Sequence, residues 1–261
     1  MSDGMYQHFR PSEQPLVKRF EEFAHRVERS SISALTDFLS PREAWIAKIV
    51  ASKHSLGSFD YGGYDGAERT RTFFCSYGQE VSKHEYEIVA IQIDVSRGGE
   101  KLRHADFLGA LLGLGIRREA IGDIAFLPEG KTAFAFCIKQ MAPILLRDLT
   151  QVGRFPVHVR LEEKPPVAQF VQAVMSERQV TLQSLRLDAF LAHAFGLSRS
   201  KAVEPIRSGK VRLNYAVCLE PAQEIQVNDL VSLRGFGRAR VLAIEGNSRS
   251  GRTFVRIGRY E

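Results

Sequence analysis

The order of apolar patterns between residues 86 and 160 constrains the fold more than any other feature of the chain. Apolar residues that alternate predict strands, and apolar residues with a period near 3.6 predict helices. The predicted elements are, in order, strand 86–95, helix 104–114, strand 123–127, strand 132–138, helix 142–149 and strand 155–160. This β-α-β-β-α-β order predicts a ferredoxin-like sandwich.

Two phenylalanines on one predicted strand of this sandwich bear on its function. The RNA-recognition-motif fold has the same topology, and its central strands carry aromatic side chains that stack on bases. Phe134 and Phe136 are two residues apart, so they share one face of the strand. Because aromatic side chains on strands are often buried, we favour packing of both rings under the helices over base stacking.

The segment before the sandwich is predicted to be helical. Residues 15–27 carry apolar side chains at helical spacing. Ser40, Pro41 and Glu43 are typical of a helix start, with Ser40 as the cap, Pro41 as the first helical residue and Glu43 completing a capping box. A turn region rich in glycine and aspartate is expected at residues 59–69.

Consecutive prolines separate the sandwich from the C-terminal third. Pro165 and Pro166 stop both a helix and a strand ladder, and 261 residues exceed one typical domain. The expected fold class is α+β. Its predicted parts are an α-rich N-terminal domain at 1–82, an RRM-like sandwich at 83–163, a linker with a leading strand at 164–183 and a C-terminal domain at 184–261.

The positive charge of the chain is concentrated at its C-terminal end. The net charge is +6. From Arg178 to Glu261 there are 14 Lys and Arg against 7 Asp and Glu, whereas residues 1–177 carry 22 against 23. A basic end on a neutral body is typical of a domain that binds a polyanion, with nucleic acid and an anionic membrane surface as the candidates.

Several functional classes are disfavoured by what the sequence lacks. No apolar run approaches the roughly 18 residues of a membrane span, and the first residues do not resemble a secretion signal. The three cysteines are far apart, the seven histidines are scattered, and the common catalytic motifs are absent. We therefore expect a cytoplasmic protein that is not an enzyme, with no catalytic residues, metal site, cofactor or membrane partner.

A short helical hairpin is predicted at the start of the basic third. Its first helix spans residues 187–195 and ends at Gly196. Ser198 caps a second helix, and Gly209 suits the left-handed residue at its end. The apolar side chains of the first helix follow the spacing i, i+3, i+4, i+7, at Leu187, Phe190, Leu191 and Ala194.

The hairpin and its surroundings resemble the S-four RNA-binding domain, named for a small-subunit ribosomal protein. The residues that carry this resemblance are Arg186-Leu187-Asp188, Ser198-Arg199-Ser200-Lys201-Ala202, Ile206 and Gly209-Lys210-Val211-Arg212-Leu213-Asn214. Other segments extend the match to nearly the whole chain: Tyr6-Gln7-His8-Phe9, Gly63-Tyr64-x-Gly66-Ala67-Glu68-Arg69, Leu114-Gly115-Ile116-x-Arg118, Gly122-Asp123-Ile124 and Arg234-Gly235-Phe236-Gly237-Arg238. Together they resemble the bacterial YlmH family.

This resemblance implies a cytosolic protein that docks on structured ribosomal RNA of the large ribosomal subunit, with a tRNA as a further candidate partner. Members of the family are linked to ribosome-associated quality control of stalled nascent chains, and their genes commonly lie near cell-division genes. Two alternatives stay open. One is an RNA-modifying enzyme with its site in residues 84–163, and the other is a cell-division adaptor that binds protein partners.

The candidate RNA contacts are cations of the hairpin and of the strands that follow it. Guanidinium and ammonium groups meet phosphates, whereas Asp188 is expected to orient a neighbouring arginine. Arg252 and Arg256 share a strand face and are weaker candidates. The candidate set is Arg186, Arg199, Lys201, Arg207, Lys210, Arg212, Arg234, Arg238 and Arg240.

Pro205 departs from the pattern of a regular second helix. A proline inside a helix removes one backbone hydrogen bond, here to the carbonyl of Lys201, and costs about 3 kcal/mol unless the helix kinks. The sequence therefore leaves the relative placement of Arg199 and Arg207 open.

Overall fold

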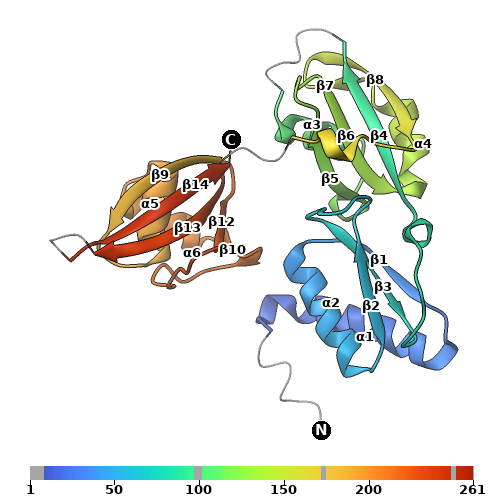
Figure 1. The fold of residues 1–261 in the computed structure, drawn as a ribbon, viewed down its shortest axis with the longest axis horizontal. Coiled ribbons are helices and arrows are strands. Elements are labelled where there is room, and N and C mark those ends of the chain that lie inside the picture. Colours follow the sequence, from blue (N-terminus) through green and yellow to red (C-terminus); the bar gives the residue numbers. More distant parts are fainter. Residues whose placement is uncertain (1–8, 97–101, 172–174, 248–250, 261) are drawn as a thin grey trace. The chain divides into compact units, whose positions relative to one another are not determined.

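The computed structural model describes residues 9–96, 102–171, 175–247 and 251–260 (Figure 1). The chain divides into two compact units, Met1–Val171 and Gln172–Glu261, so the predicted N-terminal and middle domains lie within one unit. Residues 6–8, which open the N-terminal motif, lie outside the described residues. In the part of the chain that is described, no helix is both long and apolar enough to cross a membrane.

The N-terminal part of the first unit combines the two expected helices with a three-stranded sheet of order β1-β3-β2. The predicted capping box is confirmed, because the Ser40 amide donates to Glu43 Oε2 at 2.7 Å. The expected turn region at 59–69 begins later than predicted, since residues 59–61 belong to β2, where Phe59 pairs with Phe73 of β3. The elements are η2 (Pro11–Glu13), α1 (Gln14–Ser30), β1 (Ala34–Leu39), α2 (Pro41–Lys53), β2 (Gly57–Tyr61) and β3 (Thr70–Cys75).

The middle part has the predicted β-α-β-β-α-β order. Its sheet has the order β5-β6-β4-β8-β7, which is the ferredoxin-like arrangement with β7 added at one edge. On the helix side of the sheet, the ring centroids of Phe107 in α3 and Phe126 in β5 are 5.2 Å apart, and Phe126 pairs with Ala133 of β6. The elements are η3 (Lys83–Tyr86), β4 (Ile88–Val95), α3 (His104–Gly113), η5 (Arg118–Ala120), β5 (Ile121–Phe126), β6 (Thr132–Ile138), η6 (Lys139–Met141), α4 (Ala142–Asp148), β7 (Gln151–Val152), β8 (Phe155–Glu162) and η7 (Val167–Gln169).

The opposite face of this sheet is covered by aromatic side chains from outside the sandwich. Phe134 and Phe136, which alternate with the helix-side residues of β6, are each 1% exposed. The Phe134 ring lies 5.3 Å from that of Phe170, and the Phe136 ring lies 4.8 Å from that of Tyr64. Their expected burial is confirmed, but the expected cover is wrong: the rings pack under Tyr64 and Phe170 and not under the helices. Figure 1 shows η7 crossing this face in yellow.

The carboxylate of Asp123 joins the N-terminal part to the middle sheet. It accepts hydrogen bonds from the Tyr64 hydroxyl at 2.9 Å and from the backbone amides of Glu68 and Arg69 at 2.7 and 3.1 Å. Burial raises the pKa of Tyr64, and the charge of Asp123 raises it further. The Arg69 side chain also donates to the carbonyl of Phe38 at 2.9 Å. These bonds link segments far apart in the sequence, which explains why the two parts form one unit.

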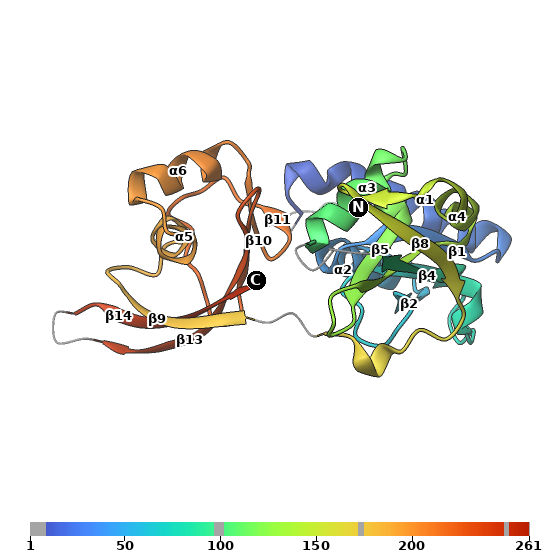
Figure 2. The same cartoon turned by 90° about the horizontal axis from the view of Figure 1, so that it is seen from above.

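The second unit is a six-stranded antiparallel sheet with a helical hairpin on one face. The strand order is β11-β10-β12-β13-β14-β9, so the first strand in sequence lies at the edge beside the last. Figure 2 shows α5 and α6 on one side of this sheet. The elements are β9 (Met175–Leu182), α5 (Leu187–Phe195), α6 (Arg199–Arg207), β10 (Val211–Leu213), β11 (Ala216–Val217), β12 (Leu230–Leu233), β13 (Gly237–Asn247) and β14 (Thr253–Tyr260).

Replacement of Asp123 by alanine should destabilise the first unit. The change removes the acceptor of two backbone amides and one phenol, and we expect the free energy of unfolding to fall by about 2–3 kcal/mol. Trp45 is the single tryptophan of the chain and lies in α2, so its fluorescence during urea unfolding reports on this unit.

Asp65→Ala provides the matched control. The Asp65 side chain is 87% exposed and pairs only at the surface with Lys83, so its loss should change stability by less than about 0.5 kcal/mol. Equal effects of the two substitutions would contradict the role assigned to Asp123.

Candidate nucleic-acid interface

The helical hairpin has the boundaries that the sequence predicts. Helix α5 ends at Gly196, which has a left-handed φ of 67°. Ser198 caps α6, and its Oγ accepts a hydrogen bond from the Lys201 amide at 3.3 Å. The inner sides of both helices are fully buried against the sheet, through Leu187, Phe190, Leu191, Ala194, Ala202 and Ile206. The hairpin is therefore a firmly packed support for the cations on its surface.

Asp188, at the start of α5, holds two of the candidate arginines. Its side chain is only 4% exposed. The Arg186 guanidinium donates to both carboxylate oxygens, at 3.2 and 2.7 Å, and one Arg199 nitrogen lies 3.5 Å from Oδ1. Arg186 and Arg199 are themselves 38% and 53% exposed, so one buried carboxylate presents two guanidinium groups to solvent. This is the orienting role that the sequence predicts for Asp188.

The protonation behaviour of Asp188 agrees with this geometry. Burial alone would raise its pKa, but the hydrogen bonds from Arg186 and the charges of Arg199 and Arg186 outweigh that effect, and the pKa is lowered. The pKa of Arg186 is raised by the same hydrogen bond. Asp188 and Arg186 therefore both stay charged at neutral pH.

Pro205 does not break the second helix. Helix α6 runs from Arg199 to Arg207 with Pro205 in its last turn, and the Lys210 amide donates to the Pro205 carbonyl at 2.9 Å. Arg199 and Arg207 consequently lie at opposite ends of one nine-residue helix.

Three more of the predicted residues lie around the C-terminal end of α6. Arg207 is the last residue of the helix, and Lys210 follows the turn. The Arg234 amide donates to the carbonyl of Lys210 at 3.0 Å, so these two residues are neighbours although they are far apart in sequence. The Lys210 ammonium lies 3.8 Å from Glu204 in a pair exposed to solvent.

The last three predicted residues lie on the sheet face away from the hairpin. Arg212 pairs with Ser232, and Ser232 pairs with Arg238, so Arg212 and Arg238 lie on the same face of the sheet. Arg240 is two residues after Arg238 and shares this face, while the residues that alternate with the arginines are in the core. Tyr260 connects the two arginines of β13: Arg240 Nε donates to its hydroxyl at 3.2 Å, and the Arg238 guanidinium lies 5.0 Å from its ring centroid. The nine predicted residues thus fall into three groups, on the hairpin, at the end of α6 and on the outer sheet face.

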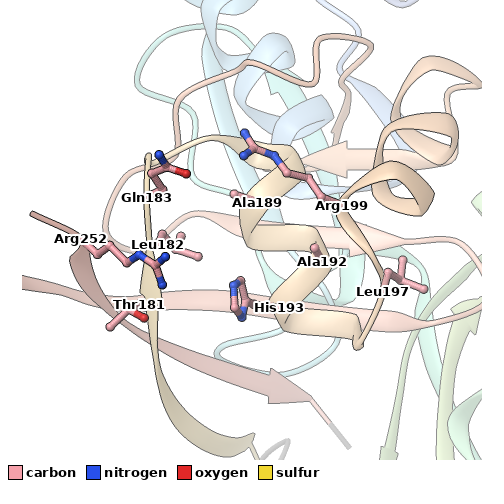
Figure 3. Close-up of a pocket in the computed structure, with 9 residues that line it drawn as sticks. All are labelled: Thr181, Leu182, Gln183, Ala189, Ala192, His193, Leu197, Arg199 and Arg252. Atoms are coloured by element: carbon pink, nitrogen blue, oxygen red, sulfur yellow. The ribbon is translucent and has the colours of Figure 1, made fainter. Parts of the chain in front are cut away.

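A pocket of about 300 Å³ opens beside the Arg199 end of the hairpin (Figure 3). One wall is formed by the end of β9 and by Gln183 directly after it, and the other by α5, with Ala192 and His193. Arg199 and Arg252 both line it. The sequence analysis predicts Arg252 only as a weaker candidate and does not predict Gln183 or His193. The reason is that no local sequence pattern shows that β9 pairs with β14.

A possible set of metal ligands lies in the first unit. In the described part of the chain, His25, Glu28 and His54 bring three ligand atoms within 4.8 Å of one another. The two imidazole Nδ1 atoms hydrogen-bond to the Glu28 carboxylate itself, at 3.0 and 2.8 Å, which ties the end of α2 to α1. The geometry as it stands is that of a hydrogen-bonded cluster.

Comparisons with known proteins agree with this architecture. A family model described as "Putative RNA-binding domain in YlmH" matches residues 82–167, and the S4 domain model matches residues 185–231. Ribosome-associated protein quality control protein P2 of Bacillus subtilis (strain 168) is 33% identical over 252 residues, which cover 95% of each chain. The solved structure of Cell division protein ylmH from Streptococcus pneumoniae is 29% identical, with a TM-score of 0.52, and the match covers 61% of this chain and 96% of that one.

The fold and the basic hairpin define a protein of the S4 RNA-binding class. Identity of 33% with a relative along nearly its full length narrows the class further. The chain belongs to the YlmH family.

Replacement of Asp188 by asparagine should destabilise the second unit at neutral pH. The amide keeps the shape of the side chain but not its charge, and we expect a loss of about 2 kcal/mol. Because the pKa of Asp188 is lowered by folding, its contribution is present above the ordinary pKa of about 4 and is lost as the pH falls through the lowered value. The difference between the two proteins should therefore shrink below about pH 4. Native-state hydrogen exchange of the α5 amides measures it.

Glu204→Gln is the control, since the Glu204 side chain is 72% exposed and pairs at 3.8 Å with Lys210. We expect little change at any pH. A difference between wild type and Asp188→Asn that stays constant from pH 7 to pH 3 would show that the charge of Asp188 is not what stabilises the unit.

Proposed function

We propose that this protein docks on structured ribosomal RNA of the large ribosomal subunit through its C-terminal unit, with a tRNA as a second RNA partner. The observation that carries the proposal is the ion-paired group in which Asp188 presents Arg186 and Arg199 to solvent. Guanidinium groups held in place by a carboxylate suit bidentate contacts with phosphates. Lys201, which is exposed and lies two residues after Arg199 in α6, adds a third positive charge to the start of this helix.

The other two groups extend the proposed footprint. Arg207, Lys210 and Arg234 add cations at the far end of α6, and Arg212, Arg238 and Arg240 add cations on the outer sheet face. Contacts to phosphate fix the position of a protein on RNA without reading its sequence. We assign the leading role to the hairpin group because its side chains are oriented from within the fold.

The names of two relatives indicate the cellular process in which this RNA binding takes part. The curated relative is named as a ribosome-associated quality control protein, and we infer the same process for this chain, in the cytoplasm. The relative of known structure is named as a cell division protein. This name indicates a link between the family and cell division, which RNA binding alone does not explain.

The middle domain does not offer the base-stacking face of an RNA-recognition motif. The sheet face that carries stacked bases in RNA-recognition motifs is occupied here by Phe170 and Tyr64 over Phe134 and Phe136. We propose that this domain takes no base on that face.

Replacement of Arg199 and Lys201 by alanine together should weaken binding to purified large ribosomal subunits and to their isolated ribosomal RNA. Each charged contact is expected to contribute about tenfold in affinity. Each lost phosphate contact should also lower the slope of log affinity against log salt by about 0.7–0.9. Co-sedimentation at several salt concentrations gives both quantities.

The control replaces an exposed arginine and an exposed lysine in the other unit. Arg147 and Lys83 are 76% and 67% exposed, and each is paired only at the surface. The variant Arg147→Ala, Lys83→Ala should bind like wild type. Failure of the wild-type protein to sediment with subunits at low salt, or an equal loss in both variants, would overturn the proposal.

A further inference from the structure

The pocket beside the hairpin combines cations with an apolar wall. Ala189, Ala192 and Leu197 form the apolar part, on α5 and the turn that follows it. Arg199 lines the same pocket from the start of α6, and Arg252 lines it from the residue just before β14. Figure 3 shows the Arg252 guanidinium on the β9 side and the His193 ring on the helix side. Binding of an inorganic anion would need only the two arginines. The apolar wall therefore indicates a ligand that also has a flat apolar part.

Size limits the ligand further. A volume of about 300 Å³ is at the lower end of the range for small-molecule sites, which run from roughly 300 to 1,000 Å³. It suits one planar ring system and excludes a dinucleotide cofactor. Gln183 and Thr181 on the β9 wall supply an amide and a hydroxyl that can donate or accept hydrogen bonds to the edge of such a ring.

His193 adds a ring to the wall. Partial burial and the nearby charge of Arg178 lower its pKa, so the imidazole is neutral at physiological pH. A neutral imidazole does not add to the charge of the two arginines and offers a flat face for stacking.

The pocket is continuous with the basic group on the hairpin. Arg199 belongs to both, because it lines the pocket and also lies 3.5 Å from Asp188. An RNA backbone held by Arg186 and Arg199 would therefore run past the mouth of the pocket. A base inside a paired helix is stacked and cannot enter, whereas an unpaired base in a loop or bulge can.

We propose that this pocket takes one unstacked base of the bound RNA, with its phosphate between Arg199 and Arg252. The inference rests on the proposed RNA-binding function and adds to it that the protein recognises an unpaired nucleotide and not a continuous helix. Gln183 would then influence which base is preferred.

The test uses two RNA hairpins with the same stem, one of them with a single unpaired nucleotide in the stem, made with each of the four bases. The full-length protein should bind the best bulged hairpin about tenfold more tightly than the uninterrupted stem, as expected for one stacked base. With 2-aminopurine as the unpaired base, binding should change the fluorescence, and the uninterrupted stem gives no such signal.

Ala192→Leu fills the pocket and should remove the preference while leaving affinity for the uninterrupted stem unchanged. Ala222→Leu places the same side chain on an exposed loop of the same unit and should keep the preference. Gln183→Ala should alter the ranking of the four bases. Because it changes an exposed side chain and leaves the core intact, it tests the pocket even if Ala192→Leu folds poorly.

The outcomes separate this inference from the proposed function. Equal affinity of the wild-type protein for both hairpins overturns the pocket assignment. So does a preference that survives in Ala192→Leu together with an unchanged ranking of the four bases in Gln183→Ala. In that case a loss of stem binding in the Arg199→Ala, Lys201→Ala variant still supports RNA docking. Absence of binding to every hairpin and to large subunits overturns both.

Discussion

Asp188 carries a negative charge into the interior of a unit whose surface is positive, and two guanidinium groups make that placement favourable. An isolated buried carboxylate would be neutralised or exposed, because water solvates its charge far better than apolar side chains do. Here Arg186 and Arg199 replace the lost water, and Leu187 beside it remains fully buried. The ion pair therefore stabilises the start of α5 and orders the surface at the same time.

Ordering before binding has an energetic consequence. A free arginine side chain loses much of its rotational freedom when it is fixed on a phosphate, and that entropy opposes binding. The carboxylate has already restricted Arg186 and Arg199 in the folded protein. An RNA that replaces part of this ion pair with phosphate contacts exchanges one set of charged hydrogen bonds for another, at a smaller entropic cost.

Much of this architecture could be predicted from local sequence, and what could not shares a physical reason. The capping box at Ser40, the ends of the hairpin at Gly196 and Ser198, and the strand order of the middle sandwich follow from short patterns. The strands β1 and β2, the cover over Phe134 and the pocket with Arg252 depend on pairing between distant segments. Pro205 shows the converse, since a local rule counts against a regular helix here and yet α6 runs through this residue from Arg199 to Arg207.

The cover over the middle sheet also determines where this protein can be divided. Residues 164–171 look like a linker in the sequence, yet Phe170 packs on Phe134 and the Val171 amide donates to the Phe126 carbonyl at 2.8 Å. A fragment cut at Lys164 would lose the Phe170 ring that covers Phe134, and exposed apolar surface of this kind promotes aggregation. A fragment that ends at Val171 keeps the Phe170 ring over Phe134. The two units are therefore best separated several residues after Pro165 and Pro166, where the sequence predicts the boundary.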